Sequence, residues 1–213
     1  MPEHQPDRRN KGAATRDRIL VEARRTLIND GYDAFVLRTV AERLDMKLGN
    51  LQYYFRTRDD LLLEVIRREA LSDLESMRVI VEQEQPPLDA LRQLVHALVG
   101  KWRADSGVVF TTLAFLSLHR EPFRAVYRDV YSAFYDELER AIECAEPGHE
   151  RIEYQQRARL LTALIDGAAM QTQTGPRGRF LESVLEAAMR IAIAPWPTRP
   201  SAVKLAATAN CRH

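Results

Sequence analysis

One short polar segment of the chain carries side chains that could read nucleic acid. Within Leu37 to Phe55 (LRTVAERLDMKLGNLQYYF), an apolar set begins at Leu48 and Leu51 and ends at Phe55. Lys47, Asn50, Gln52, Tyr53 and Tyr54 point away from that apolar side. Amides hydrogen-bond base edges, whereas phenols and amines meet phosphates. The pattern favours a helix that contacts DNA, and an ordinary helical hairpin with a solvated polar face is the alternative.

The flanking residues predict the elements that would position this segment. Leu37, Val40, Ala41 and Leu44 have the spacing of one buried helical face, and Asp45 and Met46 interrupt that rhythm. Upstream, residues 16–30 are expected to form a helix with one apolar face, and Gly31 is expected to end it. Downstream, residues 57–60 provide a cap and acidic residues for the first turn of a long helix. Three helices with a short polar third one predict a helix-turn-helix DNA-binding unit.

The sequence resembles the TetR family of bacterial transcriptional regulators. The resemblance is strong over about residues 13 to 73. The matching residues are Arg18-Ile19-Leu20, Gly31-Tyr32-Asp33-Ala34, Arg38, Val40-Ala41-Glu42-Arg43, Gly49-Asn50-Leu51, Tyr53 to Phe55 and Thr57-Arg58-Asp59-Asp60-Leu61-Leu62, with a weaker likeness at Ala163-Leu164-Ile165-Asp166-Gly167. The resemblance implies an all-helical homodimer that represses promoters. It also implies that DNA is released when a small molecule binds the C-terminal domain.

Four positions depart from the pattern of that family. Val36 stands where Ser or Thr usually caps the second helix, so this cap is expected to be absent. Asp45 replaces the glycine of the turn, and Asp tolerates left-handed geometry better than most residues. Lys47 stands at a frequent capping position and Gln52 at a frequent tyrosine position. These last two changes bear on which DNA sequence is preferred.

The expected DNA contacts divide into positioning and reading. Phosphate contacts are expected from Lys47, Tyr53, Tyr54 and Arg58, the last aided by the positive end of its helix. Base or sugar contacts are expected from Asn50 and Gln52. Arg38, which matches the pattern of the family, completes the set of candidate DNA-binding residues.

Composition and charge agree with a cytoplasmic DNA-binding protein. The 213 residues carry a net charge of +1, but residues 1–58 hold 12 Lys or Arg against 8 Asp or Glu. The first 15 residues lack the apolar run of a secretory signal. The longest uncharged stretch, residues 106–118, is too short to span a bilayer, so no membrane partner is expected. Cys144 and Cys211 are too few for a metal cluster or a disulfide framework.

The whole chain reads as all-α, with about nine helices and no strand pattern. After the first three helices, the expected spans are residues 57–85, 88–103, 107–119, 122–145, 152–174 and 180–193. The almost wholly apolar 107–119 helix is expected to be buried in the middle of the body. The expected organisation is a disordered arm over 1–12, the DNA-binding domain over 13–73 with its helix-turn-helix at 36–55, an effector-binding and dimerisation domain over 74–194, and a loose tail over 195–213.

Aromatic residues concentrate in the C-terminal part and suggest a small-molecule site. Four of them have the spacing of a single helical stripe, which is core in most proteins but can border a cavity whose phenols serve as polar anchors. The candidate effector-pocket residues are Trp102, Phe110, Phe115, His119, Phe123, Tyr127, Tyr131, Phe134 and Gln171. The sequence leaves the identity of the effector open.

The two last helices have apolar faces that could serve both a core and a two-fold partner. The candidate interface residues are Leu160, Leu161, Leu164, Ile165, Ala168, Leu181, Val184, Leu185, Ala188 and Met189. Packing within one protomer is the alternative for either stripe. Dimerisation also follows from DNA binding, because one short helix reads few bases and two symmetric ones multiply affinity.

Nothing in the sequence supports catalysis. The five histidines (His4, His96, His119, His149 and His213) are scattered, and no zinc-protease, nucleophile-elbow, Cys-x-x-Cys or phosphate-loop motif occurs. No cofactor or metal is expected apart from the small-molecule effector. The expected function is a sequence-specific, ligand-released repressor that binds a palindromic operator as a homodimer. A helical ligand carrier or adaptor without specific DNA binding is the competing hypothesis.

Overall fold

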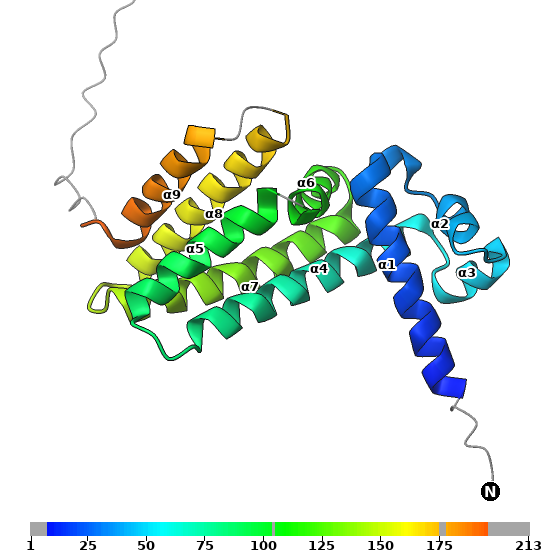
Figure 1. The fold of residues 1–213 in the computed structure, drawn as a ribbon, viewed down its shortest axis with the longest axis horizontal. Coiled ribbons are helices and arrows are strands. Elements are labelled where there is room, and N and C mark those ends of the chain that lie inside the picture. Colours follow the sequence, from blue (N-terminus) through cyan, green and yellow to red (C-terminus); the bar gives the residue numbers. More distant parts are fainter. Residues whose placement is uncertain (1–7, 104, 175–177, 196–213) are drawn as a thin grey trace, which may run out of the picture.

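Helices account for almost all of the structure, which is a computed structural model that describes residues 8–103, 105–174 and 178–195 (Figure 1). The helices are α1 (Arg8–Ala34), α2 (Leu37–Arg43), α3 (Leu48–Tyr54), α4 (Arg58–Val81), α5 (Pro87–Arg103), α6 (Asp105–Ser117), α7 (Glu121–Ala145), α8 (Arg151–Thr174) and α9 (Gly178–Ile193). No strand occurs in these ranges, so the expected all-α fold is confirmed.

Helices α1, α2, α3 and the first turns of α4 form one end of the molecule, which we call the head. Its core contains Leu27, Phe35, Val40, Leu51 and Leu62, all fully buried. The expected pair of short helices is confirmed as α2 and α3. The turn between them depends on Asp45, whose φ of 51° lies in the left-handed region.

The first helix begins earlier than expected and breaks where the sequence predicted its end. It begins at Arg8, so residues 8–12, expected to belong to a disordered arm, are helical. Residues 1–7 of that arm lie outside the described residues. Near its other end, Gly31 has φ 80° and ψ 178°, which breaks the helix where the sequence predicted a stop. The short segment after this break, Tyr32–Ala34, turns the chain towards α2.

Helix α4 joins the head to the rest of the molecule, which we call the body (Figure 1). Its start is fixed by a reciprocal cap: Asp60 N–H donates to Thr57 Oγ1 (3.1 Å), and Thr57 N–H donates to Asp60 Oδ2 (3.0 Å). The helix ends at Val81, four residues before the expected end at Gln85. One rigid element therefore begins in the DNA-binding unit and ends in the body.

The missing cap of α2 leads to a testable prediction. Val36 occupies the N-cap position with extended geometry (φ −125°, ψ 149°) and makes no side-chain cap hydrogen bond. A serine hydroxyl there could accept from an unsatisfied backbone N–H of the first turn. Val36→Ser should therefore raise the free energy of unfolding by about 1 kcal/mol relative to Val36→Ala, measured by urea denaturation. Equal stability of the two variants would show that this N-terminus gains nothing from a cap.

The body is formed by α5–α9 and the rest of α4. Helix α7 packs against α4 and α5, and α8 packs against α5 and α9. Pro122 stands in the first turn of α7, as expected. The expectation for the α6 segment was only partly right. Phe110 and Leu113 are buried, but Phe115 (60% exposed) and Leu118 (66%) face outward. No helix in the described ranges is long and apolar enough to cross a membrane.

The end of α9 is attached to α8 by a buried arginine. Arg157 is fully buried; its Nη1 donates to the Ala192 carbonyl (2.6 Å), and its Nη2 donates to the Ala194 carbonyl (2.9 Å) and to Glu153 (2.7 Å). Ala192 lies in the last turn of α9 and Ala194 directly after it, where carbonyls have no further helical N–H donors. The guanidinium therefore caps α9 and fixes its position on α8.

Candidate DNA-binding surface and effector site

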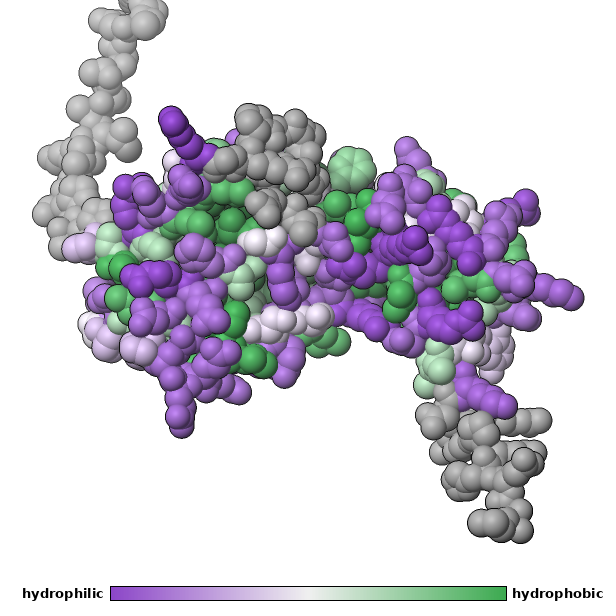
Figure 2. Space-filling view, viewed as in Figure 1, coloured by the Kyte–Doolittle hydropathy of each residue, from purple (hydrophilic) through white to green (hydrophobic). Residues whose placement is uncertain are grey.

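The polar side of α3 lies on the outside of the head. Leu51 is fully buried and anchors the helix, whereas Tyr53 is 84% exposed. Lys47, Asn50 and Gln52 are also exposed, and Tyr54 is half-buried with its ring edge-on to Tyr53 at 5.3 Å between centroids. The surface of this end of the molecule is mainly hydrophilic in Figure 2. The amides, phenol and amine of α3 can therefore reach a groove or phosphate backbone without unfolding the head.

Within the protomer, Arg58 contacts Tyr32 of α1. Its guanidinium carbon lies 3.8 Å from the centroid of the Tyr32 ring, and Nη2 donates to the Tyr32 carbonyl. The side chain is half-buried, and its Nε has no hydrogen-bond partner. In this arrangement Arg58 fastens the start of α4 to the end of α1. Arg38 on α2, by contrast, is exposed.

Two sets of ion pairs connect the head with both ends of the α6 segment. Arg24 on α1 binds Glu69 on α4 through Nε and Nη2 (2.6 and 2.9 Å) and reaches Asp105 at the start of α6 (3.2 Å). Beyond the other end of α6, Arg120 binds Asp59 in the first turn of α4 (3.0 Å through Nη1). The sequence analysis did not identify either set, because the partners lie 45 to 81 residues apart.

The body contains a partly buried cluster of two phenols and one carboxylate. The rings of Tyr127 and Tyr131 stack at 4.1 Å between centroids, and Tyr131 donates its hydroxyl hydrogen to Asp166 Oδ2 (3.0 Å). Asp166 Oδ1 is buried without a hydrogen-bond partner. Burial raises the pKa of the Asp166 carboxyl to about 7. Asp166 was not among the candidate site residues, although a carboxylate beside Ile165 and Ala169 on an apolar helical face was a usable signal.

The remaining effector-pocket candidates fall into a group that packs in the core and a group that is exposed. Phe110 and Phe134 pack edge-to-face at 5.6 Å beside Tyr131, and Phe123 is fully buried. Phe115, His119 and Gln171 are exposed and do not line the phenol cluster. The side chain of Trp102 lies outside the described residues.

A small cavity opens beside Asp166. Its volume is about 30 Å³, and its lining residues are Phe110, Thr111, Ala114, Tyr131, Asp166, Ala169 and Met170. Such a space is of the order of a water molecule's share of the liquid. An organic effector can enter only if neighbouring side chains move, and Met170, which is exposed at this site, is the most accessible of them.

The proposed interface residues separate into an inner and an outer group. Leu161, Ile165, Ala168, Val184 and Ala188 are buried within the protomer, where α8 packs on α9. The outer group stays accessible to a partner and comprises exposed Leu160 with half-buried Leu164, Leu181, Leu185 and Met189. Hydrophobic patches on the body are visible in Figure 2.

Comparison with known families assigns both parts of the chain. Residues 19–65 match the model for bacterial regulatory proteins of the TetR family, and residues 87–194 match the C-terminal domain of BetI-type transcriptional repressors. Together with the exposed face of α3, these matches define a DNA-binding transcriptional regulator rather than an enzyme. The chain belongs to the TetR family.

Individual relatives agree with this assignment. The regulator BetI 1 of Chromohalobacter salexigens is 29% identical over 168 residues, 76% of this chain and 81% of the relative. An uncharacterized HTH-type regulator from the dhlA 5' region of Xanthobacter autotrophicus is 35% identical over 103 residues, and the match covers 45% of this chain and 48% of the relative.

Solved structures show the same fold. A putative regulator from Saccharomonospora viridis in complex with choline has a TM-score of 0.72 at 23% identity, covering 83% of this chain and 94% of that one. A TetR regulator from Haloarcula marismortui has a TM-score of 0.74 at 20% identity, covering 84% and 97%.

Proposed function

We propose that this protein is a ligand-released transcriptional repressor that acts in the cytoplasm as a homodimer on a palindromic operator. The observation that carries the proposal is the exposed face of α3, where Lys47, Asn50, Gln52 and Tyr53 project from a helix anchored by buried Leu51. The match of the C-terminal half to BetI-type repressors supports the direction of regulation.

Dimerisation is supported by the outer faces of α8 and α9. Leu160, Ala163, Leu164 and Gly167 recur at three- and four-residue spacing on α8, and no heavy atom lies within 4 Å of a Cβ built on Gly167. A second copy can therefore approach this helix closely. Two-fold pairing through these faces would present two α3 helices to successive major grooves of one operator.

The effector in this proposal is a small organic cation bound beside Asp166. The stacked rings of Tyr127 and Tyr131 offer aromatic faces, and the carboxylate supplies the opposite charge. The choline bound by the Saccharomonospora regulator supports a quaternary ammonium compound as the first candidate. Entry of the cation would widen the cavity against α6, which is connected to the head by ion pairs of Asp105 at its start and of Arg120 shortly after its end.

Selection of bound fragments from random double-stranded DNA, followed by titration with choline, tests the proposal. We expect an enriched palindrome whose half-sites lie about one helical turn apart. Saturating choline should then weaken binding to it by about 5- to 150-fold, the usual range of coupling between two sites. Recovery of no preferred sequence would instead favour the helical carrier or adaptor. If choline did not weaken binding to the selected operator, the protein would still be a DNA-binding regulator, but choline would be excluded as its effector.

A further inference from the structure

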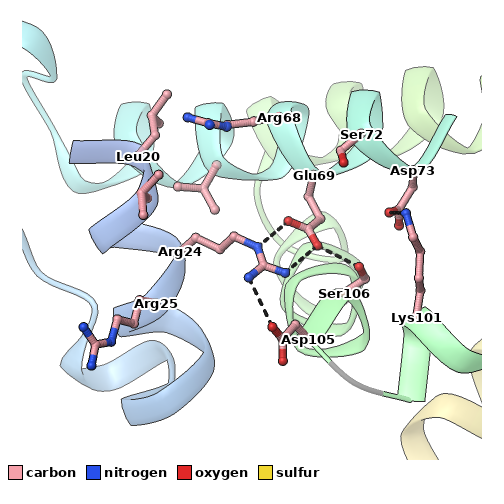
Figure 3. Close-up of a pocket in the computed structure, with 12 residues that line it drawn as sticks. Leu20, Arg24, Arg25, Arg68, Glu69, Ser72, Asp73, Lys101, Asp105 and Ser106 are labelled. Carbon is pink, nitrogen blue, oxygen red and sulfur yellow. Dashed lines mark hydrogen bonds and ion pairs between the residues drawn. The ribbon is translucent and has the colours of Figure 1, made fainter. Parts of the chain in front are cut away.

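A cleft of ligand size lies between the head and the body (Figure 3). It shares no lining residue with the cavity beside Asp166. Its volume is about 550 Å³, within the range of small-molecule sites. Helix α1 contributes Leu20, Val21, Arg24 and Arg25; α4 contributes Val65, Arg68, Glu69, Ser72 and Asp73; α5 contributes Lys101; and α6 contributes Asp105 and Ser106. We call this space the junction cleft.

Two buried carboxylates stand one turn apart on the α4 side of the junction cleft. Glu69 has its hydrogen-bonding capacity largely met, because Arg24 binds both of its oxygens and Ser106 Oγ donates to Oε1 (2.7 Å). Asp73 is only 3% exposed and receives a hydrogen bond from Lys101 Nζ on Oδ1 (2.9 Å). Its second oxygen, Oδ2, is buried and has no hydrogen-bond partner.

Burying Asp73 Oδ2 without a hydrogen bond costs free energy. The kind of group that would remove this cost indicates what the cleft would bind. Burial raises the pKa of the Asp73 carboxyl and outweighs the opposing effects of Lys101 and Ser106, and the charge of Glu69 adds to the rise. A buried carboxylate oxygen without a donor is stabilised by a hydrogen-bond donor, and most strongly by a positively charged one. The ligand should therefore bring N–H groups and a positive charge.

The other charged groups of the lining are already paired. An anion would meet three carboxylates and would have to compete for four cations, each of which has a carboxylate partner: Arg24, Arg25, Arg68 and Lys101. A metal ion lacks a site, because no group of three potential ligating His, Cys, Asp or Glu residues occurs in the described residues. Leu20, Val21 and Val65 add an apolar wall on which a short hydrocarbon chain can lie.

We propose that the junction cleft is a second small-molecule site, specific for primary amines with a short apolar chain. The ammonium group donates to Asp73 Oδ2, and the chain lies along Leu20, Val21 and Val65. Asp73 thereby distinguishes a primary ammonium from a quaternary one, which has no N–H to donate.

Occupancy of this site would act on the attachment of the head. The incoming ammonium lies near Glu69 and competes with Arg24, the residue that joins α1 to α4 and α6. An effect on operator affinity rests on the function proposed above, whereas binding in the cleft does not. The test therefore measures binding directly.

Titration of the methyl-labelled full chain with n-pentylamine, followed by NMR, locates the amine. We expect shifts at the methyl groups of Leu20, Val21 and Val65, with a dissociation constant that rises by about tenfold or more in Asp73→Asn. Glu137→Gln is the matched control, because it removes a buried carboxylate that lies outside both the junction cleft and the cavity beside Asp166, and it should leave these shifts unchanged. Pentan-1-ol and pentanoate, which keep the chain but lack the ammonium, should bind more weakly.

A surface variant keeps the test independent of how well Asp73→Asn folds. Val21 is half exposed at the mouth of the cleft, so Val21→Lys should fold and place a competing ammonium there, weakening pentylamine relative to Val21→Met. The proposal is overturned if the three methyl groups do not shift, or if their shifts persist with equal affinity in Asp73→Asn. Shifts confined to Ile165 and dependent on Asp166 would also overturn it, while leaving the effector site beside Tyr131 in place.

Discussion

Operator affinity should fall by about a hundredfold or more when Lys47 and Tyr53 are both replaced by alanine. Each residue is exposed on the outer side of α3, where removing a phosphate contact costs on the order of 1–2 kcal/mol. Because Tyr53 is 84% exposed, its replacement should leave the fold intact. Fluorescence anisotropy with the selected operator measures the loss, and Lys47→Ala alone should lower the slope of log affinity against log salt by about one.

Arg92→Ala is the matched control for charge and for surface exposure. Arg92 pairs with Asp89 on α5, in the body (3.0 Å), and its removal should not change operator affinity. The same loss in both variants would indicate a general charge effect and would contradict the assignment of the α3 face. Gln52→Ala differs in kind, because we expect it to alter which sequence is selected rather than to weaken all sequences equally.

Acid should stabilise this protein through Asp166. The folded-state pKa of about 7 lies above the ordinary value of 3.8, so the folded state binds the proton more tightly than the unfolded chain. This contribution is fully present below pH 3.8 and is lost as the pH rises through 7. By linkage, Asp166 alone should cost the folded state about 2–3 kcal/mol between pH 5 and pH 8.

The Asp166→Asn variant isolates that contribution, because asparagine can still accept the Tyr131 hydroxyl but does not ionise. Urea unfolding at equal protein concentration should show a smaller loss of stability between pH 5 and pH 8 in this variant than in the wild type. Asp129→Asn, at an exposed position on α7, should behave like the wild type. Parallel stability profiles for wild type and Asp166→Asn would contradict the raised pKa.

The same carboxyl links effector binding to pH. A cation beside Asp166 prefers the ionised form, so its binding releases the proton that the carboxyl carries at low pH. Choline affinity should therefore increase as the pH rises from 6 to 8, and Asp166→Asn should abolish most of this increase. Isothermal titration calorimetry at several pH values measures both effects.

Much of the head could be predicted from sequence because its determinants are local. The spacing of Leu37 and Val40, the left-handed Asp45 and the Thr57 cap each act within a few residues. The resemblance to the TetR family covers the same region. The start of α1 was missed, because Arg8 to Lys11 form a polar turn without the apolar periodicity on which the prediction relied.

The sites in the body depend on contacts between distant residues, and sequence spacing does not record these. Phe115 and Phe110 look equivalent in an apolar segment, yet one faces outward and the other lies in the core. Arg58 stays a predicted phosphate contact, but sequence spacing did not reveal that the Tyr32 ring lies against its guanidinium. Asp166 becomes a candidate site residue through its hydrogen bond with Tyr131, which lies 35 residues earlier in the chain.

The Arg24–Asp105 and Arg120–Asp59 bridges complicate how ionic strength will be interpreted in binding experiments. Both are partly accessible to water, so added electrolyte screens them as it displaces protein from phosphates. Loosening the two bridges lets the reading helices adopt more orientations, which costs affinity independently of counterion release. Phosphate contacts counted from the ionic-strength dependence of the intact protein will therefore exceed the true number.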